Sequence, residues 1–143
     1  MRFMMIVKAS QESEAGGTPD PKMMAEMGMF NEEMVKAGVL LAAEGLQSSA
    51  KGARIQITKG KRTVVDGPFA ETKELIAGFW IIQVKSRQEA IDWALRAPAP
   101  HGDGVDTHIE VRQVGELEDF GPDLPQKIRE QEEKLRAELA KKK

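Results

Sequence analysis

The chain has 143 residues, of which 41% are apolar and 31% are charged, a composition that suits one compact domain and excludes disordered and collagen-like chains. Its 21 basic and 23 acidic residues give a formal charge of −2, so no basic surplus favours nucleic acid as a partner. The lack of cysteine excludes disulfides and a cysteine nucleophile. No apolar stretch reaches the roughly 18 residues of a membrane span, and residues 1–10 lack signal-peptide features, so we expect a cytoplasmic protein without membrane partners.

The first third of the chain predicts a strand, a loop and a helix. Residues Arg2–Lys8 form a short apolar run typical of a buried strand, and a polar loop is expected over Ser10–Pro19. Asp20 is a suitable N-cap for a helix that begins at Pro21 and ends at Gly38. Apolar residues recur on one face of this helix at spacings of three and four, namely Met23, Met27, Phe30, Met34 and Ala37.

All eight methionines lie within residues 1–34. Because methionine fills irregular spaces, one hypothesis is an adaptable apolar pocket between this helix and the sheet, and the alternative is ordinary core packing.

The remaining body predicts further strands and one more helix. Residues Ala53–Lys59 alternate strictly, with Ile55 and Ile57 on one face. A turn at Gly60 and Lys61 leads into a strand that ends at Asp66. A central strand, a helix capped by Ser86 that stops at Pro98, and a last alternating strand follow, with the two strands at Ala77–Val84 and Thr107–Val114.

The order strand, helix, strand, strand, helix, strand is that of a ferredoxin-like α+β fold, in which both helices cover one face of an antiparallel sheet. We expect Ile55 and Ile57 to face the helices, as Ile109 and Val111 do in the last strand. The opposite face then carries the polar residues of the last strand, namely His108, Glu110 and Arg112. Met4, Ile6, Trp80 and Ile82 are too apolar to face water if they share this face. A second copy of the chain is expected to cover this face, which predicts a homodimer.

The C-terminal part differs in composition from the body. After a linker at residues 121–125, residues 126–143 carry seven basic and four acidic side chains. A thin apolar stripe of Ile128, Leu135 and Leu139 predicts a solvated helix. The predicted organisation is therefore a domain at residues 1–120 and a charged helical tail at 121–143.

The most unusual local sequence is Asp66-Gly67-Pro68-Phe69-Ala70-Glu71-Thr72-Lys73-Glu74. Gly67 permits unusual dihedral angles and Pro68 cannot extend a strand, so the strand is expected to end sharply, with Phe69 anchored in the core. The string resembles the signature of the DGPF family within the YCII-related superfamily. Shorter matching segments occur in the expected order at residues 2–5, 43–46, 78–80, 89–94 and 110–112.

The resemblance implies a ferredoxin-like domain that pairs as a dimeric α+β barrel. The wider superfamily includes isomerases, monooxygenases without cofactors and a lyase. In other YCII-like members a histidine on the first helix and an aspartate before a proline form a proposed dyad. The matching positions here are Met27 and Ala97, so that chemistry does not carry over.

Few side chains remain for chemistry. Asp66, Glu71 and His101 are candidates for proton transfer, because a carboxylate in a partly apolar cleft and an imidazole in a loop both suit acid–base work. Structural roles compete with these: Asp66 as a turn former, His101 as a solvated loop residue. The candidates for substrate binding are Glu44, Lys73, Trp80 and Arg112. No metal-ligand motif or cofactor fingerprint is present, so neither metal nor cofactor is expected.

Two functions follow from this inventory. The first is a homodimeric barrel that binds a small aromatic or acidic metabolite and performs lyase- or isomerase-type acid–base chemistry without a cofactor. The alternative is a non-catalytic regulatory or protein-interaction module associated with transcription. In that case the DGPF loop is a structural clasp and the charged tail contacts the partner.

Overall fold

The computed structural model describes residues 1–142; Lys143, the last residue of the predicted tail, lies outside the described part. The chain forms two compact units, Met1–Gln113 and Val114–Lys143.

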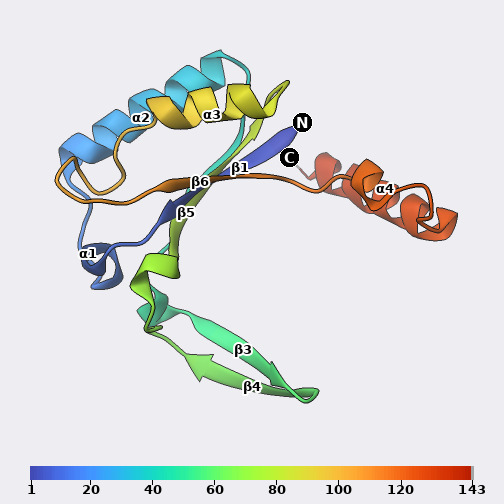
Figure 1. The fold of residues 1–143 in the computed structure, drawn as a ribbon, viewed down its shortest axis with the longest axis horizontal. Helices are drawn as coiled ribbons and strands as arrows, with labels where there is room; N and C mark the ends of the chain where they lie inside the picture. Colours follow the sequence, from blue (N-terminus) through green and yellow to red (C-terminus); the bar gives the residue numbers. More distant parts are fainter. Residues whose placement is uncertain (143) are drawn as a thin grey trace. The chain divides into compact units, whose positions relative to one another are not determined.

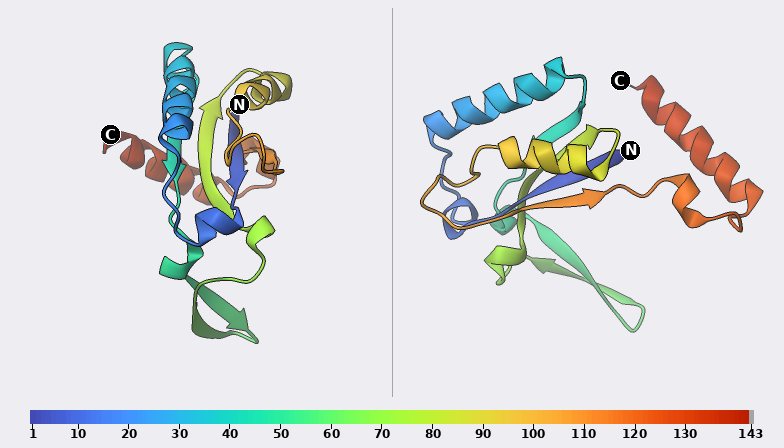
Figure 2. Two further views of the ribbon diagram at one scale, coloured as in Figure 1. Left: turned by 90° about the vertical axis from the view of Figure 1, so that its left-hand side faces the viewer. Right: turned by 45° about the horizontal axis from the view of Figure 1, so that its top comes forward.

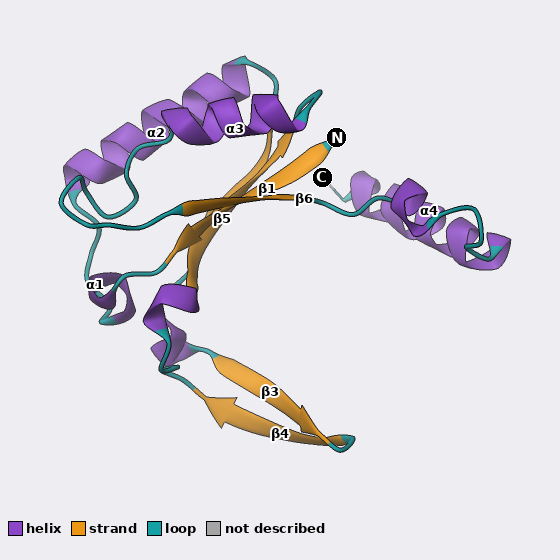
Figure 3. Cartoon of the chain, in the orientation of Figure 1, coloured by secondary structure: helices purple, strands orange, loops and turns teal. Residues whose placement is uncertain are grey.

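The first unit is built on a four-stranded sheet of β1 (Arg2–Lys8), β2 (Leu40–Gly45), β5 (Ile76–Gln83) and β6 (Ile109–Gln113). The strand order is β2-β5-β1-β6, and every neighbouring pair is antiparallel. Helix α2 (Pro21–Lys36) joins β1 to β2, and helix α3 (Arg87–Arg96) joins β5 to β6. Both helices lie on the same side of the sheet (Figures 1 and 3). This confirms the predicted ferredoxin-like α+β fold.

The helix boundaries follow the predicted caps. Asp20 accepts a hydrogen bond from the Lys22 amide, and Pro21 occupies the first turn of α2. Ser86 accepts from the Glu89 amide at the start of α3. The core lies between the helices and the sheet, and its buried side chains include Phe3, Met5, Phe30, Met34, Trp80, Ile82, Ala90 and Trp93.

The opposite face of this sheet, which we call the open face, is partly apolar. Met4 lies opposite Ile81 and Arg112, and Ile6 lies opposite Phe79 and Glu110, so these side chains share the face. The expectation for Met4, Ile6, Glu110 and Arg112 is therefore confirmed. The expectation for Trp80 and Ile82 is wrong: both are buried in the core on the helix side, because they alternate with Phe79 and Ile81 along β5.

The predicted second strand of the sheet is also wrong. Strand β3 (Ala53–Thr58) pairs only with β4 (Lys61–Asp66), and the two form a separate hairpin closed by a turn at Lys59 and Gly60. Ile55 and Ile57 share one face, as predicted, but they are exposed instead of facing the helices. The hairpin extends away from the four-stranded sheet in Figures 1 and 2.

The second strand of the sheet is instead β2, whose sequence Leu-Leu-Ala-Ala-Glu-Gly lacks β-branched residues and clear alternation. A register shift between Leu40 and Ala42 further interrupts its pairing with β5. Tertiary pairing therefore sets this strand, and local preference does not.

Four short helical segments lie between the longer elements: α1 (Gln11–Glu14) and the 3₁₀ turns η1 (Ser49–Lys51), η2 (Thr72–Glu74) and η3 (Leu117–Phe120). The predicted loop at Ser10–Pro19 thus contains a helical turn. Ser10 and Ser13 close it by a reciprocal pair of side-chain to backbone hydrogen bonds.

The second unit contains η3 and helix α4 (Gln126–Lys141). The predicted stripe of Ile128, Leu135 and Leu139 is present on α4, and all three side chains are exposed. Among the described residues, no helix is long and apolar enough to span a membrane.

Residues 66–74 are hereafter called the DGPF string. Glycine at position 67 of this string is required by close packing and not by an unusual φ angle. Its amide donates a 3.0 Å hydrogen bond to the Gly52 carbonyl oxygen. A Cβ atom at this position would lie 1.7 Å from the Ser49 carbonyl oxygen. Phe69 follows outside the core cluster, where the Arg54 guanidinium lies 3.9 Å from its ring centroid. The expected anchoring of Phe69 in the core is therefore wrong.

Substituting Gly67→Ala should lower the free energy of unfolding by about 1–3 kcal/mol, because backbone must move to admit the new methyl group. Gly104→Ala is the control, since a Cβ there meets nothing within 4 Å. Urea unfolding of both variants measures the difference. Equal stabilities would show that the close approach at Gly67 is not maintained in solution.

Candidate functional site

A cavity of about 810 Å³, here called the α2 cavity, lies against helix α2. Its lining comes from α1 and the loop that follows, α2, β2, β5 and the loop after α3. Residues far apart in sequence therefore meet around one space, as is usual for ligand sites in small domains.

Methionine contributes to the apolar part of the lining. Met23, Met24 and Met27 of α2 line the cavity, whereas Met5 and Met34 belong to the core. The methionine-rich segment thus contributes both to core packing and to a cavity wall. Flexible thioether side chains let such a wall adapt to different apolar shapes.

Trp80 forms another part of the lining and is held in place by two contacts. Its Nε1–H donates a 2.7 Å hydrogen bond to Asn31 Oδ1 on α2. Its ring also meets the Phe30 ring edge to face, with 5.5 Å between centroids. Because Asn31 accepts through oxygen, its amide nitrogen keeps two N–H donors. Asn31 itself lines the cavity.

Gly28 lies in the interior of α2 and also lines the cavity. A Cβ atom there would meet nothing within 4 Å. Glycine inside a helix costs about 1 kcal/mol relative to alanine. The surrounding fold therefore provides no steric reason for glycine at this exposed position.

Helix α1 is fastened to the turn η1 by Glu14. The Glu14 carboxylate accepts hydrogen bonds from the Ser49 backbone amide, at 3.0 Å, and from the Ser49 hydroxyl. The Ser48 hydroxyl donates to the Glu14 backbone oxygen. Ser49 Oγ in turn accepts from the Phe69 amide at 3.1 Å. This chain of bonds, which we call the Glu14 clasp, connects one side of the cavity to the DGPF string.

His101 lines the α2 cavity from the loop after α3. Its Nε2 lies 2.6 Å from the backbone oxygen of Lys8. A carbonyl oxygen only accepts hydrogen bonds, so Nε2 carries the proton in this contact. In the neutral ring, Nδ1 then holds the lone pair and is the atom able to accept a proton.

The charged residues around the cavity are mainly acidic. Glu12, Asp20 and Glu44 line it against a single ammonium, that of Lys51. Asp20 already serves as the α2 cap. The electrostatic field of this lining therefore disfavours a ligand with a strongly anionic end.

A second cavity, of about 690 Å³, is lined by Glu71, Lys73 and Glu74 from the DGPF string and by Asp106. His101 borders both cavities. A hydrogen bond with the Glu71 side chain, together with the charge of that carboxylate, raises the pKa of Glu74 above its ordinary value.

The predicted site residues do not converge on one point. His101, Glu44 and Trp80 line the α2 cavity, whereas Glu71 and Lys73 line the second one. Asp66 ends β4 and is exposed, and it borders neither cavity.

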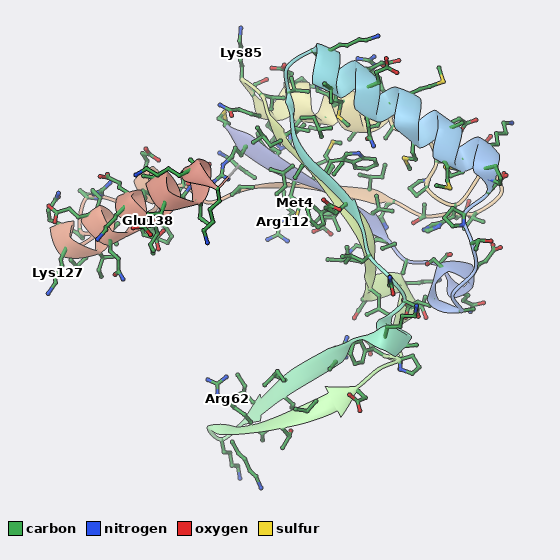
Figure 4. The ribbon with its side chains drawn as sticks, turned by 180° about the vertical axis from the view of Figure 1, so that it is seen from behind. Met4, Arg62, Lys85, Arg112, Lys127 and Glu138 are labelled. Atoms are coloured by element: carbon green, nitrogen blue, oxygen red, sulfur yellow. The ribbon has the colours of Figure 1, made fainter. Side chains whose placement is uncertain are left out.

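Arg112 lies on the open face (Figure 4). Its Nη1 atom lies 3.2 Å from Glu110 Oε2. This is an ion pair within one chain, and it uses one of the residues predicted to bind substrate.

Sequence patterns alone missed Asn31, Glu14 and Gly28. The bonds of Asn31 and Glu14 join residues 49 and 35 positions apart, so no local pattern indicates them. Gly28 does leave a signal, because a lone glycine inside a helical pattern suggests a packing or functional reason. Within residues 1–142, no group of three His, Asp or Glu side chains is placed to hold a metal ion.

Comparison with known proteins identifies one family. The YCII-related domain matches residues 1–117 of the chain. An uncharacterised protein of Rhizobium meliloti is 36% identical over 75 residues, which is 52% of this chain. The match spans 60% of the length of that relative.

The raised pKa of Glu74 leads to a test that follows one side chain. NMR titration of the Glu74 carboxyl should show a pKa above the ordinary glutamate value, and Glu71→Ala should return it toward that value. The folded state binds this proton more tightly than the unfolded state. The contribution of Glu74 to stability is therefore greatest at low pH and is lost as pH rises through its raised pKa. An unchanged pKa in Glu71→Ala would contradict the pairing.

Proposed function

Because the chain belongs to the YCII-related family, we propose that it binds a small, largely apolar metabolite in the α2 cavity and acts as a homodimer. The observation that carries this proposal is the open wall at Gly28 beside Met27, Asn31 and Trp80. A volume of about 810 Å³ lies within the range of sites for small organic ligands.

The lining supports an aromatic ligand over an acidic one. The methionine side chains of the lining make favourable contacts with aromatic groups. The acidic side chains of Glu12 and Asp20 beside the cavity disfavour an anion. The Asn31 amide supplies donors for a neutral oxygen, which would orient a phenol, ketone or amide group.

Acid–base chemistry without a cofactor is supported for His101 more than for the carboxylates. Its ring is oriented by the bond to Lys8, and Nδ1 is left as a proton acceptor at the border of the α2 cavity. Glu71 reaches only the second cavity, and Asp66 reaches neither. We therefore assign proton transfer, if the bound metabolite reacts, to His101.

The homodimer is supported by the open face of the sheet. Met4, Phe79 and Ile81, which are half-buried, form an apolar strip across the two central strands together with Ile6, which is buried. An antiparallel sheet with helices on one side needs either a polar second face or a partner to cover it. A second copy covers such a strip symmetrically.

A non-catalytic interaction module is the second candidate. It is favoured by the Glu14 clasp, which ties the DGPF string to α1 as a structural fastening. It is also favoured by the position of Asp66 outside both cavities. A ligand that binds the α2 cavity would favour the first function, because an interaction module requires no ligand there.

Two substitutions of Gly28 test ligand binding. Gly28→Ala should raise stability by about 0.5–1 kcal/mol through helix propensity and keep the ligand response. Gly28→Phe should fill the cavity and abolish that response. The measurement is a thermal-shift screen of aromatic metabolites, with the neutral dye N-phenyl-1-naphthylamine as a fluorescent probe. A ligand at about 100 times its Kd stabilises the fold by about 2.7 kcal/mol.

The control for the added ring is Ala25→Phe, because Ala25 is exposed on the same helix and does not line the cavity. It should respond to ligand like the wild type. If no compound shifts the wild-type melting temperature, or if Gly28→Phe responds as strongly as Ala25→Phe, the α2 cavity is not the binding site.

The dimer is tested by sedimentation equilibrium. The wild type should be dimeric at micromolar concentration, and Ile81→Arg should raise the dimer Kd at least about tenfold by placing a charge on the open face. Leu95→Arg is the control, since Leu95 is 77% exposed on α3. A wild-type monomer at these concentrations contradicts the dimer.

A further inference from the structure

The β3–β4 hairpin, hereafter the arm (residues 53–66), has two chemically different faces, both exposed. Cross-strand pairing places Ile55 opposite Val64 and Ile57 opposite Arg62 on one face. Ile55, Ile57 and Val64 are 56%, 57% and 67% exposed. A two-stranded hairpin alone is only marginally stable in water, and a contiguous apolar surface usually marks a contact site.

The chain fastens the arm by its other face. Arg54, which alternates with Ile55, stacks on Phe69 at 3.9 Å. The Gly67 amide bonds to Gly52 at the base of the hairpin. The contacts of the arm with its own chain thus use the Arg54 face and leave the Ile55 face to another molecule.

Charge indicates which surface suits the Ile55 face. The arm carries four basic residues and one acidic residue, whereas the rest of residues 1–113 carries ten basic and fourteen acidic residues. A basic, apolar arm therefore complements the acidic body of another copy of the same chain. Nucleic acid would satisfy the cations but would leave Ile55, Ile57 and Val64 uncovered.

The open face has the matching chemistry. Its apolar strip is bordered by Glu44 on the β2 edge, opposite Phe79, and by Glu110 on the β6 edge, opposite Ile6. Glu110 already forms two ion pairs: its Oε1 lies 3.8 Å from Lys8 Nζ, and its Oε2 lies 3.2 Å from Arg112 Nη1. Glu44 makes no ion pair within residues 1–142, and so its carboxylate is the one left for an added cation.

We propose that the arm of each copy packs its Ile55 face against the open face of the other copy, with Arg62 beside Glu44 of the partner subunit. Figure 4 shows Arg62 on the hairpin and Met4 and Arg112 on the sheet. The inference rests on the homodimer of the proposed function and adds to it an exchanged pair of arms.

The test compares two double substitutions at cross-strand pairs. Ile55→Glu with Val64→Glu changes the apolar face, and Gln56→Glu with Thr63→Glu makes the same change in charge on the other face. Both lie outside the core, so the fold is retained, as circular dichroism verifies. The first variant should raise the dimer Kd about 100-fold in sedimentation equilibrium, and the control less than about threefold.

Hydrogen exchange provides a second readout that needs no substitution. Amides of residues 53–66 should be protected when the wild type is concentrated and should exchange rapidly when it is diluted below the dimer Kd. Core strands β1 and β5 should keep their protection at both concentrations. Protection of the arm that does not depend on concentration overturns the inference.

Charge reversal tests the contact of Arg62 with Glu44. Arg62→Glu and Glu44→Arg should each weaken the dimer, and the double variant should recover most of the loss. A wild-type monomer refutes both the dimer and the arm contact. A wild-type dimer that tolerates Ile55→Glu with Val64→Glu refutes the arm contact alone. Binding of duplex DNA that is lost in Arg62→Glu, without any change in dimer Kd, would also overturn it.

Discussion

The two faces of the four-stranded sheet have different surroundings, and the rest of the molecule depends on this difference. On one face, α2 and α3 bury Phe3, Met5 and Trp80. On the other, Met4 and Ile81 lie between ionic side chains of β6 and the β2 edge. Because adjacent residues of a strand point to opposite faces, one register defines both surfaces at once. The helix-covered face and the open face are therefore two results of one set of strand pairings, β2-β5-β1-β6.

Sequence patterns predicted the helices well and the sheet only in part. Cap residues and apolar spacing define α2 and α3, since Asp20, Gly38 and Ser86 act within one turn of their helix. Alternation in residues 53–58 predicted a strand, and that was right. What alternation does not report is which surface the apolar side will meet. A strand of a hairpin outside the core shows the same alternation of apolar and polar residues as a strand inside it. Strand β2, whose residues hardly alternate, occupies the position in the sheet that was predicted for residues 53–58.

The residues of the candidate site also divide into those that local sequence patterns predict and those that only the folded structure brings together. Met23 and Met27 could be foreseen on the sheet-facing side of a helix, because their spacing is a property of that helix. The partners of Asn31 and Glu14 could not, because each bond joins elements that meet only after the sheet has formed. The DGPF string illustrates the limit. Its sequence is unusual enough to identify a family, yet its carboxylates lie away from the α2 cavity, and its glycine serves a backbone contact with Ser49.

Comparison of Gly67 with Gly28 separates what the fold requires from what it allows. At Gly67, any side chain would collide with the Ser49 carbonyl, so the fold itself explains the glycine. At Gly28, a side chain meets empty space and would strengthen the helix, so the fold explains nothing. For this reason the α2 cavity, more than the unusual DGPF string, is the place at which this chain departs from the simplest stable packing.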